Sequence, residues 1–201
     1  FGTLILLPLY MQQVLGTTTL ESGLALLPGG LLMGVLGWFV GRLFDRIGPR
    51  PLIIPGSILA AAGLWGMYVS FSAESSLAIV VVWHMILSVG LALLFSPLLT
   101  SALGSLPPHL YSHGSALLNT LQQVAAAAGT ALFITVMTLG IVAGAESGEG
   151  DVAAQMTGVH NALLVGAIIS LITVVGAWFV RNTAQTEGPA VAPMAEEPVA
   201  S

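Results

Sequence analysis

Residues 41–51 have the sequence Gly-Arg-Leu-Phe-Asp-Arg-Ile-Gly-Pro-Arg-Pro and separate two long apolar stretches. Gly48 can take the positive φ of a helix C-cap or turn, and Pro51 suits the first turn of a following helix. The arginines of the segment can pair with Asp45 and with lipid phosphates. The pattern predicts a tight, basic turn between two helices.

The composition of the chain outside this turn is strongly apolar. Of the 201 residues, 56% are hydrophobic and only 6% are charged, and the mean hydropathy is +0.96. A soluble domain has about 25% charged residues. Because so few charges cannot cover a surface in water, the composition predicts a protein whose solvent is lipid.

Six stretches of the chain meet or nearly meet the length of a membrane span. A helix needs about 20 mostly apolar residues to cross a hydrocarbon core roughly 30 Å thick. The stretches are 1–15, 23–44, 52–71, 77–103, 115–142 and 159–180. We expect an all-α membrane protein in which residues 1–181 form one transmembrane helical bundle, with the first span truncated because the chain begins inside it. The Pro-, Ala- and Glu-rich residues 182–201 are expected to form a disordered cytoplasmic tail.

The four arginines predict how this bundle is oriented. Arg42, Arg46 and Arg50 flank the turn, and Arg181 ends the last span. An even number of crossings separates the turn from Arg181, so one topology places all four in the cytoplasm, as the positive-inside rule requires. The opposite connectors hold acids and no base. We therefore expect a multi-pass membrane protein with its C-terminus in the cytoplasm.

Residue counts exclude several classes of function. The chain has no lysine and only four arginines, too few for the basic surface that binds nucleic acid. It has no cysteine, and His109 and His113 have no third ligand near them, so we expect no metal site and no cofactor. No span contains a clustered catalytic set, which argues against a membrane enzyme.

Six residues of the turn carry a resemblance to a known family. They fit the pattern G-x-L-x-D-R-x-G-x-R and are Gly41, Leu43, Asp45, Arg46, Gly48 and Arg50. This pattern resembles the signature loop of the major facilitator superfamily, which recurs between the second and third spans of each six-helix half. Pro49 departs from it, since the family usually has a basic residue there. The resemblance implies a loop that gates the cytoplasmic side.

Three further stretches extend the resemblance to most of the chain. They are Leu7–Val14, Glu21–Gly30 and Gly114–Val124, and they are similar to the C-terminal half of fourteen-span drug efflux proteins of the EmrB/QacA type. The resemblance implies the last six spans of a secondary transporter of a bacterial plasma (inner) membrane. Such a transporter exports hydrophobic or amphipathic drug-like compounds by proton antiport, and the missing N-terminal half would be the partner of this chain. The alternative is a lone six-span structural or assembly protein without transport activity.

Polar and small residues within the spans are the remaining candidates for function. The amides of Gln12, Gln13, Asn119, Gln122 and Gln123 could line a substrate cavity, or they could form hydrogen bonds between helices. Small residues that favour close helix packing are Gly30, Gly34, Gly37 and Gly41 in the second span and Ala125 and Gly129 in the fifth.

One histidine lies within the fourth span. We interpret His84 as a satisfied structural residue in preference to a proton relay. Because no Asp, Glu, Lys or Arg lies in the middle of a span, we expect the acid that couples transport to protons to lie in the missing half.

Overall fold

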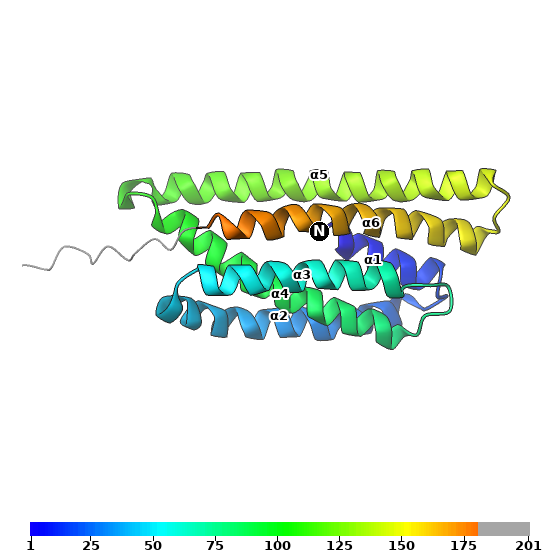
Figure 1. The fold of residues 1–201 in the computed structure, drawn as a ribbon, viewed down its shortest axis with the longest axis horizontal. Coiled ribbons are helices and arrows are strands. Elements are labelled where there is room, and N and C mark those ends of the chain that lie inside the picture. The colour runs from blue at the N-terminus through cyan, green and yellow to red at the C-terminus, as the bar shows by residue number, and fades with distance from the viewer. Residues whose placement is uncertain (181–201) are drawn as a thin grey trace, which may run out of the picture.

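The computed structural model describes residues 1–180, and it is helical throughout this range apart from the connectors. The elements are α1 (Gly2–Gln13), α2 (Thr19–Ile47), α3 (Arg50–Ser70), α4 (Leu77–Gly104), the 3-10 helix η1 (Pro108–Leu110), α5 (Tyr111–Glu146) and α6 (Asp151–Trp178). They lie side by side as one bundle, with α5 along one edge and α2 along the opposite edge (Figure 1). The expected all-α fold is confirmed, with six α-helices among the described residues. Arg181 and the expected tail 182–201 lie outside the described residues.

Five of the six α-helices are long and apolar enough to cross a membrane, namely α2 to α6. The remaining helix, α1, has 12 residues and a proline at position 8. Each of these five helices extends past at least one end of its predicted span. For example, α6 begins at Asp151 instead of Val159, because an acidic residue in the first turn interacts favourably with the helix dipole.

The N-terminus of α2 is set by a capping box. The hydroxyl of Thr18 accepts a hydrogen bond from the backbone N–H of Glu21, and the Glu21 carboxylate accepts one in return from the backbone N–H of Thr18 at 2.8 Å. This reciprocal pairing satisfies two donors that a helix start otherwise leaves open. It explains why α2 begins at Thr19, before the predicted start at Gly23.

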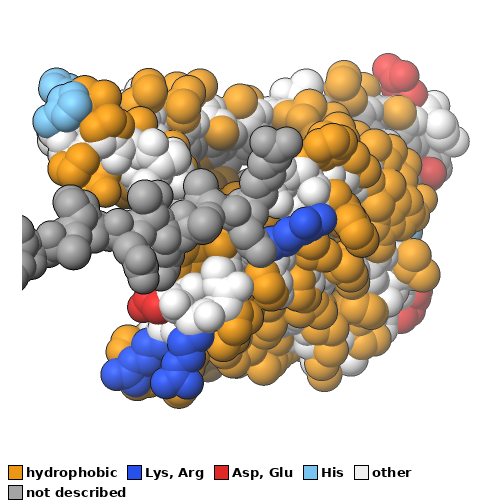
Figure 2. Space-filling model, turned by 60° about the vertical axis from the view of Figure 1, so that its left-hand side comes forward, with side chains coloured by type: hydrophobic (Ala, Val, Ile, Leu, Met, Phe, Trp, Pro, Cys, Tyr) orange, Lys and Arg blue, Asp and Glu red, His pale blue; other side chains and the backbone are white. Residues whose placement is uncertain are grey.

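Successive helices run in opposite directions, so the connectors alternate between two ends of the bundle (Figure 1). One end carries the α2–α3 and α4–α5 connectors, and the other carries the α1–α2, α3–α4 and α5–α6 connectors. Most of the blue basic side chains in Figure 2 gather toward one end, and most of the red acidic ones lie at the other. The bundle therefore has one basic and one acidic end.

The helices pack most closely where glycines remove side-chain bulk. A Cβ at Gly90 of α4 would lie 2.8 Å from the Cα of Ala60 in α3, and a Cβ at Gly140 of α5 would lie 2.7 Å from the Cα of Gly158 in α6. In lipid, where no hydrophobic force drives helices together, such close backbone approach supplies the dispersion energy that holds them. Helix α3 contacts both α4 and α6 and so joins the two sides of the bundle.

Tyr10 fastens the end of α1 to the α3–α4 connector. Its side chain is fully buried, and its ring stacks on Phe71 with centroids 4.6 Å apart. The phenol donates a hydrogen bond of 2.7 Å to the backbone carbonyl of Ser72. These contacts position α1 at the acidic end of the bundle.

Two helices have a largely open face. Buried residues make up only 17% of the most apolar window in α2 and 11% of that in the Pro108–Glu146 segment, compared with 50% in α3. Leu31 of α2 and Leu117 of α5 are each more than 60% exposed. The open surfaces of the bundle are therefore concentrated on its two edge helices.

Candidate functional site

The segment 41–51 forms the tight turn that its sequence predicts. Gly48 has φ +79° and ends α2, with its N–H donating to the carbonyl of Phe44 at 2.8 Å. Pro49 is buried directly before α3 begins at Arg50. A side chain at position 48 would be strained because positive φ favours glycine. The turn between the two helices is thus confirmed, whereas a gating role for it stays a prediction.

The charged side chains of this turn are exposed. Asp45, Arg46 and Arg50 all have exposed side chains. The guanidinium of Arg42 lies 3.7 Å from the centroid of the Trp38 ring, a cation–π contact that desolvation at a membrane interface strengthens. Because Leu43 is also exposed and Gly41 has open space beside it, this end of α2 presents an unoccupied surface to any neighbouring segment.

The candidate amides form two separate groups. Gln12 and Gln13 are exposed at the end of α1, where Gln12 accepts a hydrogen bond of 3.4 Å from Thr19. Gly2 packs on the ring of Phe133 in α5, and α1 runs from there toward the acidic end (Figure 1). Asn119, Gln122 and Gln123 lie before Phe133 along α5. At a rise of 1.5 Å per residue, the two groups are about 30 Å apart along the bundle.

The amides on α5 lie along the open edge helix. Asn119 and Gln123 are exposed, and Gln122 is half-buried. Because their spacing of three and four residues places them on one face, all three are available to a ligand or to another helix. Which of these they contact stays a prediction.

The small residues expected to pack helices have no neighbour within the described part of the chain. A Cβ at Gly30, Gly34, Gly37 or Gly41 would meet nothing within 4 Å, and the same holds for Gly129. Ala125 is exposed. The contact between α2 and α4 is made instead by Gly29, one residue before the predicted row. The predicted row therefore faces outward, and its role in packing stays a prediction that concerns a partner outside residues 1–180.

Neither of the two loop histidines belongs to a metal site in the described residues. His109 lies in η1 and His113 in the first turn of α5. No group of three or more His, Cys, Asp or Glu side chains that could hold a metal ion occurs within residues 1–180. The four-residue spacing of the two histidines therefore has no third ligand there.

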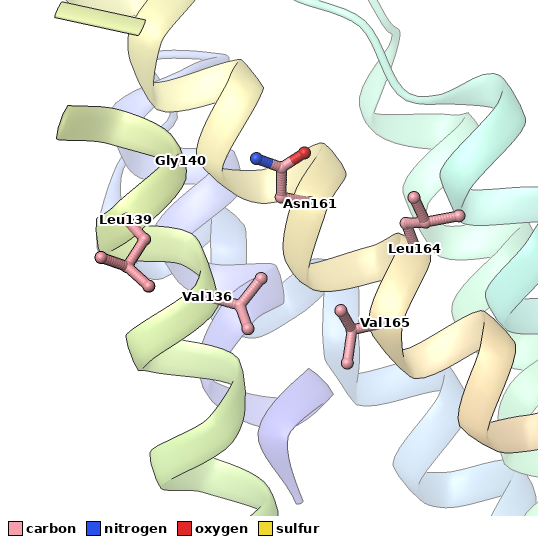
Figure 3. Close-up of a pocket in the computed structure, with 6 residues that line it drawn as sticks. All are labelled: Val136, Leu139, Gly140, Asn161, Leu164 and Val165. Carbon is pink, nitrogen blue, oxygen red and sulfur yellow. The ribbon is translucent and has the colours of Figure 1, made fainter. Parts of the chain in front are cut away.

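A shallow groove of about 310 Å³ lies between α5 and α6. It is lined by Val136, Leu139, Gly140, Asn161, Leu164 and Val165, and the amide of Asn161 is the polar group among them (Figure 3). The polar residues named from the sequence do not include Asn161 or its neighbour His160, although both lie in the predicted span 159–180. A complete scan of that span for polar residues would have found them.

His160 of α6 contacts the ring of Tyr68 in α3, with the two ring centroids 5.4 Å apart. Tyr68 in turn contacts Trp65 edge-to-face at 5.9 Å. These three aromatic rings join α3 to α6. They have a packing role that needs no ligand.

The fold and the turn together define a class of protein: a polytopic helical membrane bundle with the connector of a transporter module and no catalytic cluster among its described residues. The comparison with known families gives the particular family. Residues 1–130 match the Major Facilitator Superfamily, and the chain belongs to it. This confirms the family expected from the sequence and supports a transporter component over an enzyme.

Several curated proteins are similar to the chain over most of its length. It is 42% identical over 186 residues to a lincomycin resistance protein LmrB of Listeria monocytogenes, which covers 90% of this chain and 39% of that protein. The corresponding Bacillus subtilis protein is 35% identical over 90% of the chain. The multidrug export protein EmrB of Haemophilus influenzae is 31% identical over 65% of the chain and 26% of its own length. The chain thus spans about two fifths of the length of these two lincomycin resistance proteins.

Proposed function

We propose that this chain is part of a secondary active transporter that exports hydrophobic or amphipathic drug-like compounds in exchange for protons. The observation that carries the proposal is the 42% identity, over 90% of the chain, to a protein named for lincomycin resistance. A relative named for multidrug export supports the same class of substrate. The open, apolar bundle with amides along one edge suits compounds that bind by apolar contact and a few hydrogen bonds.

The proposed mechanism is alternating access, in which two six-helix halves rock around a site between them. The open edges of α2 and α5 are the surfaces on which the other half would pack. Gly30, Gly34, Gly37 and Gly41 leave free space along α2, and a row of small residues lets a second backbone come close. The match covers 39% of the Listeria monocytogenes LmrB, so about 60% of that protein lies outside it, which is more than enough to supply such a half.

The gating role of the α2–α3 turn follows from its place in this mechanism. Asp45 and the arginines lie exposed at the end of the edge helix α2, where a partner half would meet them. Charge-assisted hydrogen bonds across that contact would form when the cytoplasmic side closes and break when it opens. Replacement of Asp45 with Asn keeps the shape of the side chain but removes its charge, so it should abolish transport without unfolding the turn.

The orientation of the bundle is part of the proposal. The basic end carries Arg42, Arg46 and Arg50, and the acidic end carries Glu21, Glu74 and Glu146. The positive-inside rule then places the basic end, and the C-terminus with it, in the cytoplasm of a bacterial cell. Because Asn119, Gln122 and Gln123 lie in the half of α5 nearer the basic end, they would be reached from the cytoplasmic side.

The test is to express the complete gene that contains this chain in a host lacking its own major drug exporters. Growth and dye accumulation are measured over a panel of hydrophobic and cationic compounds, lincomycin included. The proposal predicts resistance to at least one compound, with lower accumulation, and its loss in Asp45→Asn. Gly176→Ala is the matched control, because a Cβ at Gly176 meets nothing within 4 Å. Unchanged growth and accumulation for every compound, with the protein present in the membrane, would refute the proposal.

A further inference from the structure

The contact between α2 and α4 is built around a buried imidazole. His84 of α4 is only 5% exposed, and its ring lies against Gly29 of α2. A Cβ at Gly29 would collide with the Nδ1 atom of His84 and would lie 2.8 Å from the Oγ atom of Ser88. The two helices can therefore pack this closely only because residue 29 has no side chain.

The Nδ1 atom of His84 has no hydrogen-bond partner. The nearby hydroxyl of Ser88 donates to the backbone carbonyl of His84 at 2.8 Å, so its proton is not directed at the ring. The sequence predicts a structural histidine whose hydrogen bonds are satisfied, and this prediction is wrong for the Nδ1 atom. A buried polar atom without a partner destabilises the packed state, and such an atom calls for a functional explanation.

His84 lies at membrane depth near the acidic end of the bundle. It follows the start of α4 at Leu77 by seven residues, or about 10 Å along the helix axis. A helix of 28 residues is about 42 Å long and so exceeds the hydrocarbon core by roughly 12 Å. If that excess is shared between its ends, the imidazole lies a few Å inside the hydrocarbon, close to water at the acidic end.

No charged group faces this imidazole from the helices that pack on α4, which are α2, α3 and α5. The titratable groups of those helices are Glu21, Arg42, Asp45 and Arg46 in α2, Arg50 and Tyr68 in α3, and Tyr111, His113 and Glu146 in α5. All but Tyr68 lie in or near the end turns, and Tyr68 faces His160 and Trp65 instead. An imidazolium at position 84 would thus be an uncompensated charge in the closed contact, so the closed contact requires neutral imidazole.

We propose that His84 is a proton-binding residue of the transporter and that its protonation is linked to separation of α2 from α4; this inference rests on the proposed function. When the contact opens toward the acidic end, water reaches the ring and Nδ1 takes a proton, so that the imidazole becomes imidazolium. The contact can close again only after that proton has left.

The structure of α2 next to this contact suits such a movement. Pro28 precedes Gly29, and a proline inside a helix lacks the N–H of one backbone hydrogen bond, so the helix bends more easily there. The other end of α2 carries the turn with Asp45. A bend at Pro28 would therefore connect the proton at His84 to the proposed cytoplasmic gate. This assignment departs from the expectation that the coupling group lies entirely outside the chain.

The experiment uses the complete protein, purified and reconstituted in vesicles, with three versions: wild type, His84→Gln and His160→Gln. The second variant is the matched control, because His160 is also an imidazole within a candidate membrane-spanning helix and it packs on Tyr68. Export of a compound that the wild type transports is measured with and without an imposed proton gradient. In His84→Gln, the factor by which the proton gradient speeds export is expected to fall at least tenfold, while downhill movement of the compound is kept. His160→Gln is expected to keep both the acceleration and the downhill movement.

A direct measurement accompanies the transport assay. The imidazole signal of His84, assigned by its absence from His84→Gln, or from His84→Asn if the glutamine variant does not fold, is followed by nitrogen NMR as pH is lowered. A titration of this signal is expected as the pH is lowered, because the proposal requires the imidazole to bind a proton. Unchanged acceleration by the gradient in His84→Gln, or a signal that does not titrate, would overturn the proposal. If the wild type transports no compound, the proposed function fails, whereas the NMR titration still decides whether His84 binds a proton.

Discussion

Replacement of Gly90 with alanine tests the packing on which the bundle depends. A Cβ at position 90 would lie 2.8 Å from the Cα of Ala60 and 2.8 Å from the carbonyl oxygen of Gly56, both backbone groups of α3. Carbon atoms are at their optimum about 3.5 to 4.0 Å apart, so α3 and α4 must separate by roughly 1 Å. Backbone cannot rotate away as a side chain can. The added methyl group therefore has to be accommodated by movement of a whole helix.

The expected loss of stability follows from two opposing effects. Overpacking of a close-packed interior typically costs about 1 to 3 kcal/mol. Alanine favours a helix over glycine by up to about 1 kcal/mol, which offsets part of that cost. We expect Gly90→Ala to destabilise the protein by about 1 to 2 kcal/mol, which increases the unfolded fraction between roughly fivefold and thirtyfold.

The assay is reversible unfolding of the complete protein in mixed micelles, followed by helical circular dichroism as the fraction of denaturing detergent increases. Gly176→Ala is the control, since a Cβ there meets nothing within 4 Å, and it should be neutral or slightly stabilising. The packing of α3 on α4 described above would be refuted if Gly90→Ala unfolded at the wild-type midpoint, or if Gly176→Ala were equally destabilised.

Three other predictions concern the ends of the bundle. Tyr10→Phe removes the hydrogen bond of 2.7 Å to Ser72 but keeps the ring stack, so the free energy of unfolding should fall by about 0.5 to 1.5 kcal/mol in the same assay; an unchanged value would contradict a role for the phenol. Thr18→Ala removes the N-cap of α2 and should cost about 1 kcal/mol, with Thr18→Ser as the control that retains the cap. Because the chain has no cysteine, single cysteines in place of Ser147 and Ser112 report the orientation of the ends. A membrane-impermeant maleimide should label position 147 and spare position 112 in intact cells, and the reverse pattern would show that the topology is inverted.

The sequence predicts the existence of the helices well because length and hydropathy alone decide whether a segment can cross lipid. It predicts their ends less well. The cap formed by Thr18 and Glu21 is a readable signature, yet it lies outside the apolar stretch that defines the span 23–44. Asp151 likewise begins α6 within what composition alone assigns to a connector. Both helices extend because polar residues complete a helix in the headgroup region, where hydropathy is no guide.

The sequence does not predict which face of each helix meets which neighbour. A helix that is apolar all round gives no periodic signal for its buried side. The row Gly30, Gly34, Gly37 and Gly41 is regular, yet the glycine that contacts α4 is Gly29. The orphaned Nδ1 atom of His84 is likewise a property of the packed structure. Pairing of helices depends on side-chain shapes that a spacing rule does not contain.

The most direct test of the central claim, that this chain forms part of a proton-driven exporter of drug-like compounds, is transport by the complete protein reconstituted in vesicles. A compound selected from the resistance panel is added, a pH gradient is imposed, and movement of the compound and of protons is recorded together. The compound should move against its own gradient while protons move the opposite way, and Asp45→Asn should abolish both movements. Compound movement that is only downhill and is unaffected by the pH gradient would contradict the central claim.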